Sequence, residues 1–131
     1  MHLVARWYAR LLAGLLAGAG VTHFAVPAPY DGLIPSFLPF SPRAWTYGSG
    51  MLELALGAAV AYPPTRHRGA QAAALLFVAV FPGNVKMAID WSDRSVAEQA
   101  IAYARLPVQV PLVFWALGVA RAADAQPAPR R

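Results

Sequence analysis

The sequence contains no cysteine and few charged residues. Without cysteine, disulfides, thiolate metal sites and thiol redox steps carried by this chain are excluded. Charged residues make up 13% of the 131 residues, which leaves no room for a separate soluble catalytic or nucleic-acid-binding domain. The chain also lacks a phosphate-binding loop, a dinucleotide fingerprint, a zinc-protease motif and a nucleophile elbow. Any electron or sulfur chemistry would therefore need a partner or a bound cofactor.

Apolar residues dominate instead, at 58% of the chain with a mean hydropathy of +0.44. They gather in four stretches, each near the ~20 residues that cross a bilayer as a helix: residues 11–29, 45–62, 70–89 and 100–120. We therefore predict an all-α polytopic membrane protein, a bundle of four transmembrane helices.

This bundle is expected to form one domain over residues 1–121, followed by a disordered cytoplasmic tail over residues 122–131. The first stretch could also be a cleaved signal peptide. An uncleaved span is favoured because three more apolar stretches follow it.

Basic residues lie at the ends of the apolar stretches, so they are read as topology signals. They form no stripe with interleaved aromatics, which argues against nucleic acid as a partner. By the positive-inside rule, both termini are expected on the cytoplasmic side of a bacterial plasma membrane. The basic residues on that side are Arg6, Arg10, Arg66, Arg68, Arg121, Arg130 and Arg131.

Prolines mark two irregular places. Residues 31–43 are apolar and interrupted by prolines, which predicts a re-entrant or interfacial segment that covers the outer end of the bundle. In the third span, Pro82 removes a backbone donor beside Gly83, so a kink and freed carbonyls near residues 78–79 are expected.

The polar residues inside the spans are the candidate site. Glu53 follows Trp45 by eight residues, which places it roughly 12 Å below the outer interface at about 1.5 Å per residue. An ionisable group at that depth is costly unless it is paired, hydrogen-bonded or protonated. The predicted ligand-binding or structural polar cluster consists of Glu53, Asn84, Arg105, Gln109 and His23.

Two interpretations of this cluster stay open. In the first, Glu53 and Arg105 form a buried pair that fixes the helix register. In the second, the cluster binds a ligand beneath the proline-rich segment and beside a broken helix. His23 is expected to be a packed or interfacial residue, since no second histidine or cysteine completes a metal site. Lys86 is expected to extend outward to the interface, and no catalytic residue is predicted.

Several motifs occur in an order that resembles the DoxX-like family of small bacterial membrane proteins, over about residues 10–118. They are Thr22-His23-Phe24, Ile34-Pro35-Ser36-Phe37-Leu38-Pro39, Ser49-Gly50 with Glu53, Phe81-Pro82-Gly83-Asn84-Val85-Lys86-Met87-Ala88, and Arg105-Leu106-Pro107-Val108-Gln109. The resemblance implies a four-helix membrane bundle with motif positions at Glu53, Asn84, Arg105 and Gln109. Family members look like subunits of a thiosulfate:quinone oxidoreductase, parts of oxidative-stress complexes or membrane chaperones.

We therefore expect an accessory subunit of a membrane redox or stress-response system rather than an enzyme as an isolated chain. Its expected ligand is a non-covalent quinone or lipid, and its expected partners are the bilayer, a membrane or periplasmic redox protein and a second copy of itself. The alternative is a membrane scaffold or assembly factor. In that case the polar cluster is structural, and the face of Gly14 and Gly18 contacts a partner helix.

Overall fold

The computed structural model describes residues 2–126, and these residues are entirely helical apart from short connections. No strand occurs in this range, so the all-α prediction is confirmed. In chain order the elements are α1 (His2–Ala25), α2 (Ala28–Asp31), α3 (Pro42–Ala61), the 3₁₀ turn η1 (Pro63–Thr65), α4 (Arg66–Ala79), α5 (Phe81–Asp90) and α6 (Val96–Asp124).

The helices extend beyond the apolar stretches of the sequence. α1 begins at His2 rather than near residue 11, and α6 continues to Asp124. Residues 122–124 are therefore helical, which corrects the predicted disordered tail, while residues 127–131 lie outside the described residues. Hydropathy marks only the apolar part of a helix, whereas arginine and alanine continue its backbone hydrogen bonding into the polar flanks.

Local sequence signals account for the helix ends. The Ser41 hydroxyl accepts a hydrogen bond from the Ala44 amide at the start of α3, and Ser95 forms a capping box with Glu98 at the start of α6. Between α4 and α5, the helix breaks at Val80, two residues before Pro82. The expected kink is thus confirmed, because proline lacks the donor that would continue the ladder.

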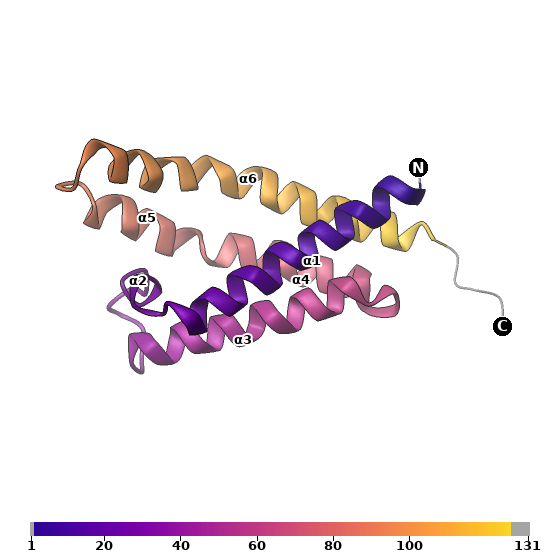
Figure 1. The fold of residues 1–131 in the computed structure, drawn as a ribbon, viewed down its shortest axis with the longest axis horizontal. Helices are drawn as coiled ribbons and strands as arrows, with labels where there is room; N and C mark the ends of the chain where they lie inside the picture. Colours follow the sequence, from indigo (N-terminus) through magenta and orange to yellow (C-terminus); the bar gives the residue numbers. More distant parts are fainter. Residues whose placement is uncertain (1, 127–131) are drawn as a thin grey trace.

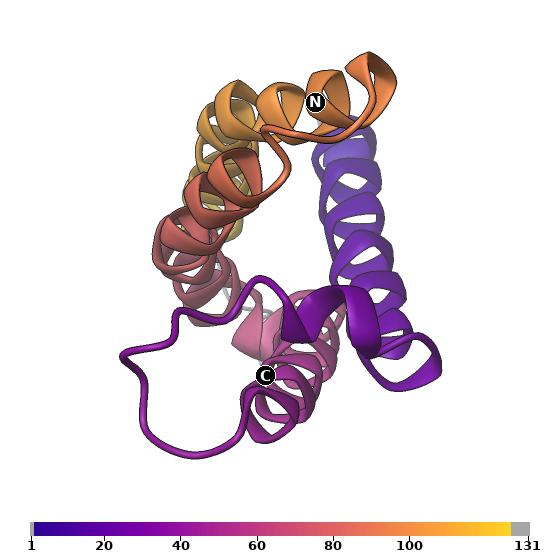
Figure 2. The same ribbon diagram turned by 90° about the vertical axis from the view of Figure 1, so that its left-hand side faces the viewer.

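The helices associate as two antiparallel pairs. α1 packs along α3, and α4 packs along α6, while α5 continues along the other half of α6 (Figure 1). The two pairs meet between α3 and α4 and, at the end opposite α2, between α1 and α6. They diverge toward the end that carries α2 (Figure 1), which faces the viewer in Figure 2. The start of α1 and the end of α6 lie together at the opposite end of the molecule (Figure 1).

Small residues bring the first pair close together. A Cβ placed on Gly20 would lie 2.9 Å from the Gly50 carbonyl oxygen, and a Cβ on Gly50 would lie 2.7 Å from the His23 Cβ. Glycine at both positions lets the backbones of α1 and α3 approach closely. His23 and Glu53 are positioned across this contact.

The outside of the molecule is apolar along all the long helices. A soluble protein rarely exposes such continuous apolar surface. The large exposed side chains include Leu11, Leu15 and Val21 on α1, Met51 and Leu52 on α3, Leu75 and Val78 on α4, and Val108, Val110 and Phe114 on α6.

Two helical stretches in the described chain are long and apolar enough to cross a membrane, Pro63–Asp90 and Val96–Asp124. α1 and α3 have 24 and 20 residues, which is enough length for a span. Their polar residues, such as Arg10 in α1 and Glu53 in α3, lower their mean hydropathy below that of the other two stretches.

Candidate functional site

His23 and Glu53 face each other across the α1–α3 contact. The His23 Nδ1 lies 3.0 Å from Glu53 Oε2, and both side chains are nearly buried. The same Nδ1 lies 2.7 Å from the Ala19 carbonyl oxygen, which can only accept, so the ring hydrogen is directed to that carbonyl. One N–H cannot fully satisfy two acceptors. Oε2 of Glu53 is consequently buried without a hydrogen-bond donor from the described residues.

Tyr30 covers the other side of this histidine. α2 turns the chain back at Pro27, so that the Tyr30 ring stacks on the His23 ring with centroids 3.8 Å apart. The Tyr30 hydroxyl is 2.7 Å from Thr22 Oγ1, which donates to the Ala19 carbonyl. Sequence reasoning missed Tyr30, although a tyrosine directly after Pro27 and Pro29 is a signal for a chain reversal onto α1.

Asp31, Arg43 and Thr46 form a hydrogen-bonded clasp at the base of the segment between α2 and α3. Asp31 accepts hydrogen bonds from Thr46 Oγ1 at 2.7 Å and from Arg43 Nε at 2.9 Å. The Thr46 hydrogen bond, followed by the Arg43 hydrogen bond and charge, holds the pKa of Asp31 below its ordinary value despite partial desolvation. The clasp fixes where the segment begins and ends on the bundle.

The same segment reaches across to the second helix pair. A Cβ on Gly83 would lie 3.1 Å from the Leu33 carbonyl oxygen, so the segment rests directly on α5. Lys86 Nζ donates to the Gly32 carbonyl at 2.9 Å and also pairs with Asp90. Lys86 extends toward the α2 end, where it ties the segment to α5. The proline-rich segment thus bridges the two pairs where they diverge.

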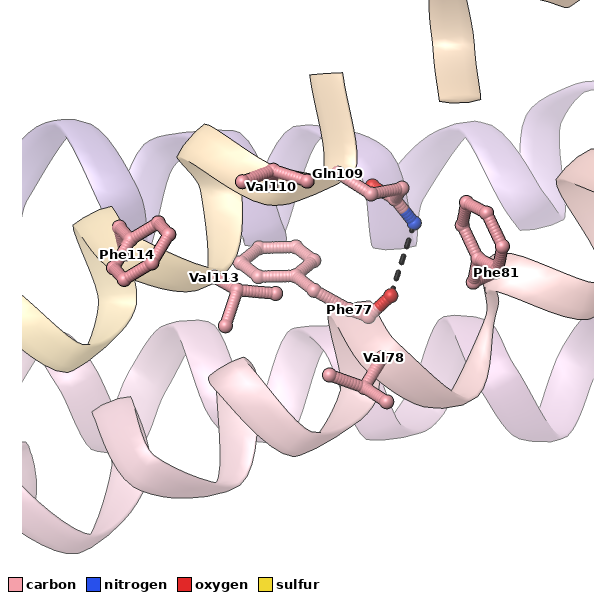
Figure 3. Close-up of a pocket in the computed structure, with 7 residues that line it drawn as sticks. All are labelled: Phe77, Val78, Phe81, Gln109, Val110, Val113 and Phe114. Carbon is pink, nitrogen blue, oxygen red and sulfur yellow. Dashed lines mark hydrogen bonds between the residues drawn. The ribbon is translucent and has the colours of Figure 1, made fainter. Parts of the chain in front are cut away.

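Gln109 supplies a hydrogen-bond donor to a carbonyl at the end of α4. The last carbonyls of a helix lack intrahelical donors, and Phe77 carries one of the last four in α4. Gln109 Nε2 donates to this carbonyl at 3.0 Å (Figure 3). The bond lies beside an apolar pocket of about 250 Å³ between α4 and α6, lined by Phe77, Val78, Phe81, Gln109, Val110, Val113 and Phe114. The nitrogen of Gln109 therefore has a structural partner.

The antiparallel contact of α5 with α6 places Asn84 level with the turn of α6 that carries Arg105. Met87 and Ala88 pack against Ala102 in one cluster, and the two helices are antiparallel, so Asn84 lies opposite the next turn of α6, which carries Arg105. Asn84 is 6% exposed and Arg105 is half-buried. Neither side chain makes a hydrogen bond to another residue of the described chain.

The structure thus separates the five expected residues into three groups. His23 and Glu53 form a contact, and Gln109 is bound to the backbone of α4. Asn84 and Arg105 lie at one level of the α5–α6 contact, and neither has a hydrogen-bond partner among the described residues. The hypothesised pair between Glu53 and Arg105 does not form, because α3 and α6 belong to different helix pairs. Among residues 2–126 there is no group of three side chains suited to a metal ion.

A family model described as a domain of unknown function (DUF8561) matches residues 12–120. No curated protein and no solved structure matches the chain.

Proposed function

Because the chain belongs to the family described as a domain of unknown function (DUF8561), which assigns no activity, we propose its function from the site itself. The protein is an integral membrane protein that holds a quinone- or lipid-like amphiphile at the polar cluster of its α2 end. It does so as an accessory subunit of a membrane redox or stress-response system.

The apolar exterior and the two long apolar stretches support membrane insertion. With α1 and α3 as further spans, the chain crosses four times, and both described ends lie on one side. The basic residues at that end support a cytoplasmic location for it in a bacterial cell, by the positive-inside rule.

One observation carries the ligand-binding role: a polar atom in the half of the bundle that carries α2, Glu53 Oε2, is buried without a hydrogen-bond donor from the described residues. The buried Asn84 and the half-buried Arg105 also make no hydrogen bond within the described chain. An unsatisfied buried polar group costs about 1–3 kcal/mol, and a charged one at mid-bilayer costs more. A purely structural network would satisfy these groups internally, whereas a ligand with polar atoms would satisfy them on binding.

The resemblance to the DoxX-like family supports the redox setting, since its motif positions include Glu53, Asn84 and Arg105. In this proposal Arg105 and Asn84 hold polar atoms of the ligand, and His23 packs against Glu53. The chain is not an enzyme by itself. A membrane or periplasmic redox protein would carry the chemistry.

Native mass spectrometry of the protein purified in mild detergent tests this function. We expect a retained small molecule, identified as a quinone or lipid from its mass, and loss of that molecule in Arg105→Ala. Arg68→Ala is the control, because Arg68 is exposed in the opposite half of the molecule. A preparation that is folded and free of small molecules would refute the proposal.

A scaffold role is the second candidate, and one observation favours it. Cβ atoms placed on Gly14 and Gly18 would meet nothing within 4 Å, so this exposed face of α1 is free to receive another helix. Under this role, Gly14→Leu with Gly18→Leu abolishes recovery of a partner in mild detergent and Arg105→Ala leaves it intact. The opposite pattern favours the ligand-binding role.

A further inference from the structure

The positive charges at the α2 end are almost all neutralised inside the protein. Arg43 pairs with Asp31 at 2.9 Å, Lys86 pairs with Asp90, and Arg94 lies 3.5 Å from Glu98. Arg94 also sits 4.3 Å above the Trp91 ring. These three cations therefore need no external anion.

Arg105 is the exception at this end. It has no acidic partner within 4 Å, no hydrogen bond and no aromatic ring under its guanidinium among the described residues. It follows Val96, the first residue of α6, by nine residues, or about 14 Å along the helix axis. Its neighbours Ala104 and Leu106 are apolar. A guanidinium at this depth is costly without a compensating anion, because arginine does not lose its proton in proteins.

Asn84 supplies a second donor next to this charge. It lies on the buried face of α5, opposite the turn of α6 that carries Arg105, and its amide is free. Glu53 does not compensate Arg105, since it is on α3 beside His23. The remaining acid at this end, Asp93, is exposed in the turn between α5 and α6. The pair Arg105 and Asn84 thus offers hydrogen-bond donors and a net positive charge.

We propose that the ligand of this site is an anionic phospholipid, with its phosphate bound by the Arg105 guanidinium and the Asn84 amide. This inference rests on the membrane-embedded ligand site proposed above and selects between its two ligand classes. A guanidinium binds phosphate oxygens in a bidentate manner. A neutral quinone would leave the arginine charge uncompensated, whereas a phosphodiester cancels it and leaves its acyl chains against the exposed apolar surface.

Lipid titration of the purified protein in detergent tests the proposal. Phosphatidylglycerol, phosphatidylcholine, ubiquinone and inorganic phosphate are added separately, and bound adducts are counted by native mass spectrometry alongside the melting temperature. We compare the unaltered protein with Arg105→Gln, Arg105→Lys and Arg94→Gln. Arg94 is the matched control, because it is an arginine at the same end that is already paired with Glu98.

Phosphatidylglycerol is expected to bind most tightly and to raise the melting temperature. Arg105→Gln should weaken this binding by about tenfold or more, the usual range for charge-assisted hydrogen bonds. Arg105→Lys should restore part of it, and Arg94→Gln should leave it unchanged. Inorganic phosphate should give no comparable shift, since it lacks the acyl chains.

Four results would overturn the inference. A preference for ubiquinone that depends on Arg105 would replace the lipid by a quinone and leave the proposed function standing. An equal effect of inorganic phosphate would assign the site to the free anion. If Arg94→Gln weakens phosphatidylglycerol binding as much as Arg105→Gln does, the binding depends on general surface charge and not on this site. If none of the added compounds binds, the proposed function is refuted as well.

Discussion

At the residue scale, Gly50 sets the distance between α1 and α3 and therefore the His23–Glu53 contact. A side chain at Gly50 would meet His23 Cβ at 2.7 Å and Phe24 Cε2 at 2.9 Å. Gly48, two residues earlier on α3, has nothing within 4 Å of its would-be Cβ. The two glycines share a helix and differ only in what they face.

Gly50→Ala is therefore expected to destabilise the protein by about 1–3 kcal/mol, the usual cost of overpacking a close contact. Gly48→Ala should be neutral or slightly stabilising, because alanine is the better helix former and no clash opposes it. Thermal unfolding in detergent measures both variants. Equal melting temperatures would show that the α1–α3 contact is not as close as described.

Asp31 gives the protein an acid-sensitive clasp. Its folded-state pKa is lowered by Thr46 and Arg43, so the stability it contributes is fully present above its ordinary pKa of about 3.8. That contribution is lost as pH falls through the lowered folded-state value. The effect concerns the start of the proline-rich segment rather than the whole bundle.

We expect Asp31→Asn to lower the melting temperature at pH 6 and to remove the part of the acid sensitivity that appears as pH falls from about 4 to 2. Arg43 would then be unpaired and Thr46 would keep a neutral acceptor. Melting curves of the unaltered protein and the variant across this range measure the effect. Parallel pH profiles for the two proteins would contradict a role for the clasp.

At the scale of single elements, the break between α4 and α5 is built jointly by Pro82 and Gln109. The proline ends α4 at Ala79, and the glutamine from α6 satisfies the exposed Phe77 carbonyl. Pro107 and Pro111 lie within α6 without dividing it. They are four residues apart and exposed on one face, so the missing donors fall on the outside of the helix.

Gln109→Leu should cost about 1–3 kcal/mol, because it leaves a buried carbonyl without a donor in an apolar environment. Gln71→Leu is the matched control, since Gln71 is exposed on α4 and makes no hydrogen bond to the described residues. Thermal unfolding compares the two variants. If Gln109→Leu is as stable as Gln71→Leu, the hydrogen bond from Gln109 does not stabilise the end of α4.

At the scale of the whole molecule, four antiparallel passes place the start of α1 and the end of α6 together (Figure 1). The turn at η1 lies at that same end, and the turn between α5 and α6 lies at the other. Under the proposed topology, these two turns face opposite sides of the membrane.

Because the sequence has no cysteine, single cysteines report this topology without background. Asp93→Cys should react with a membrane-impermeant maleimide added to intact spheroplasts. Pro64→Cys, also at an exposed position, should react only after permeabilisation. Labelling of both from outside, or of Pro64→Cys alone, would contradict the proposed orientation.

The sequence by itself determined the helices and the nature of the polar residues. Long apolar stretches required helices, and Pro82 required a break. These features depend on neighbours within a few residues along the chain, so they can be predicted without a structure.

Only the tertiary structure decided which polar groups meet. Glu53 was expected beside Arg105, but it lies against His23, Gln109 is bound to the Phe77 carbonyl, and Arg105 is left without a partner. Helical periodicity gives a residue's face and depth but not the rotation of one helix against another. That rotation follows from close packing at Gly20 and Gly50, which joins α1 to α3 and separates both from α6 at the α2 end.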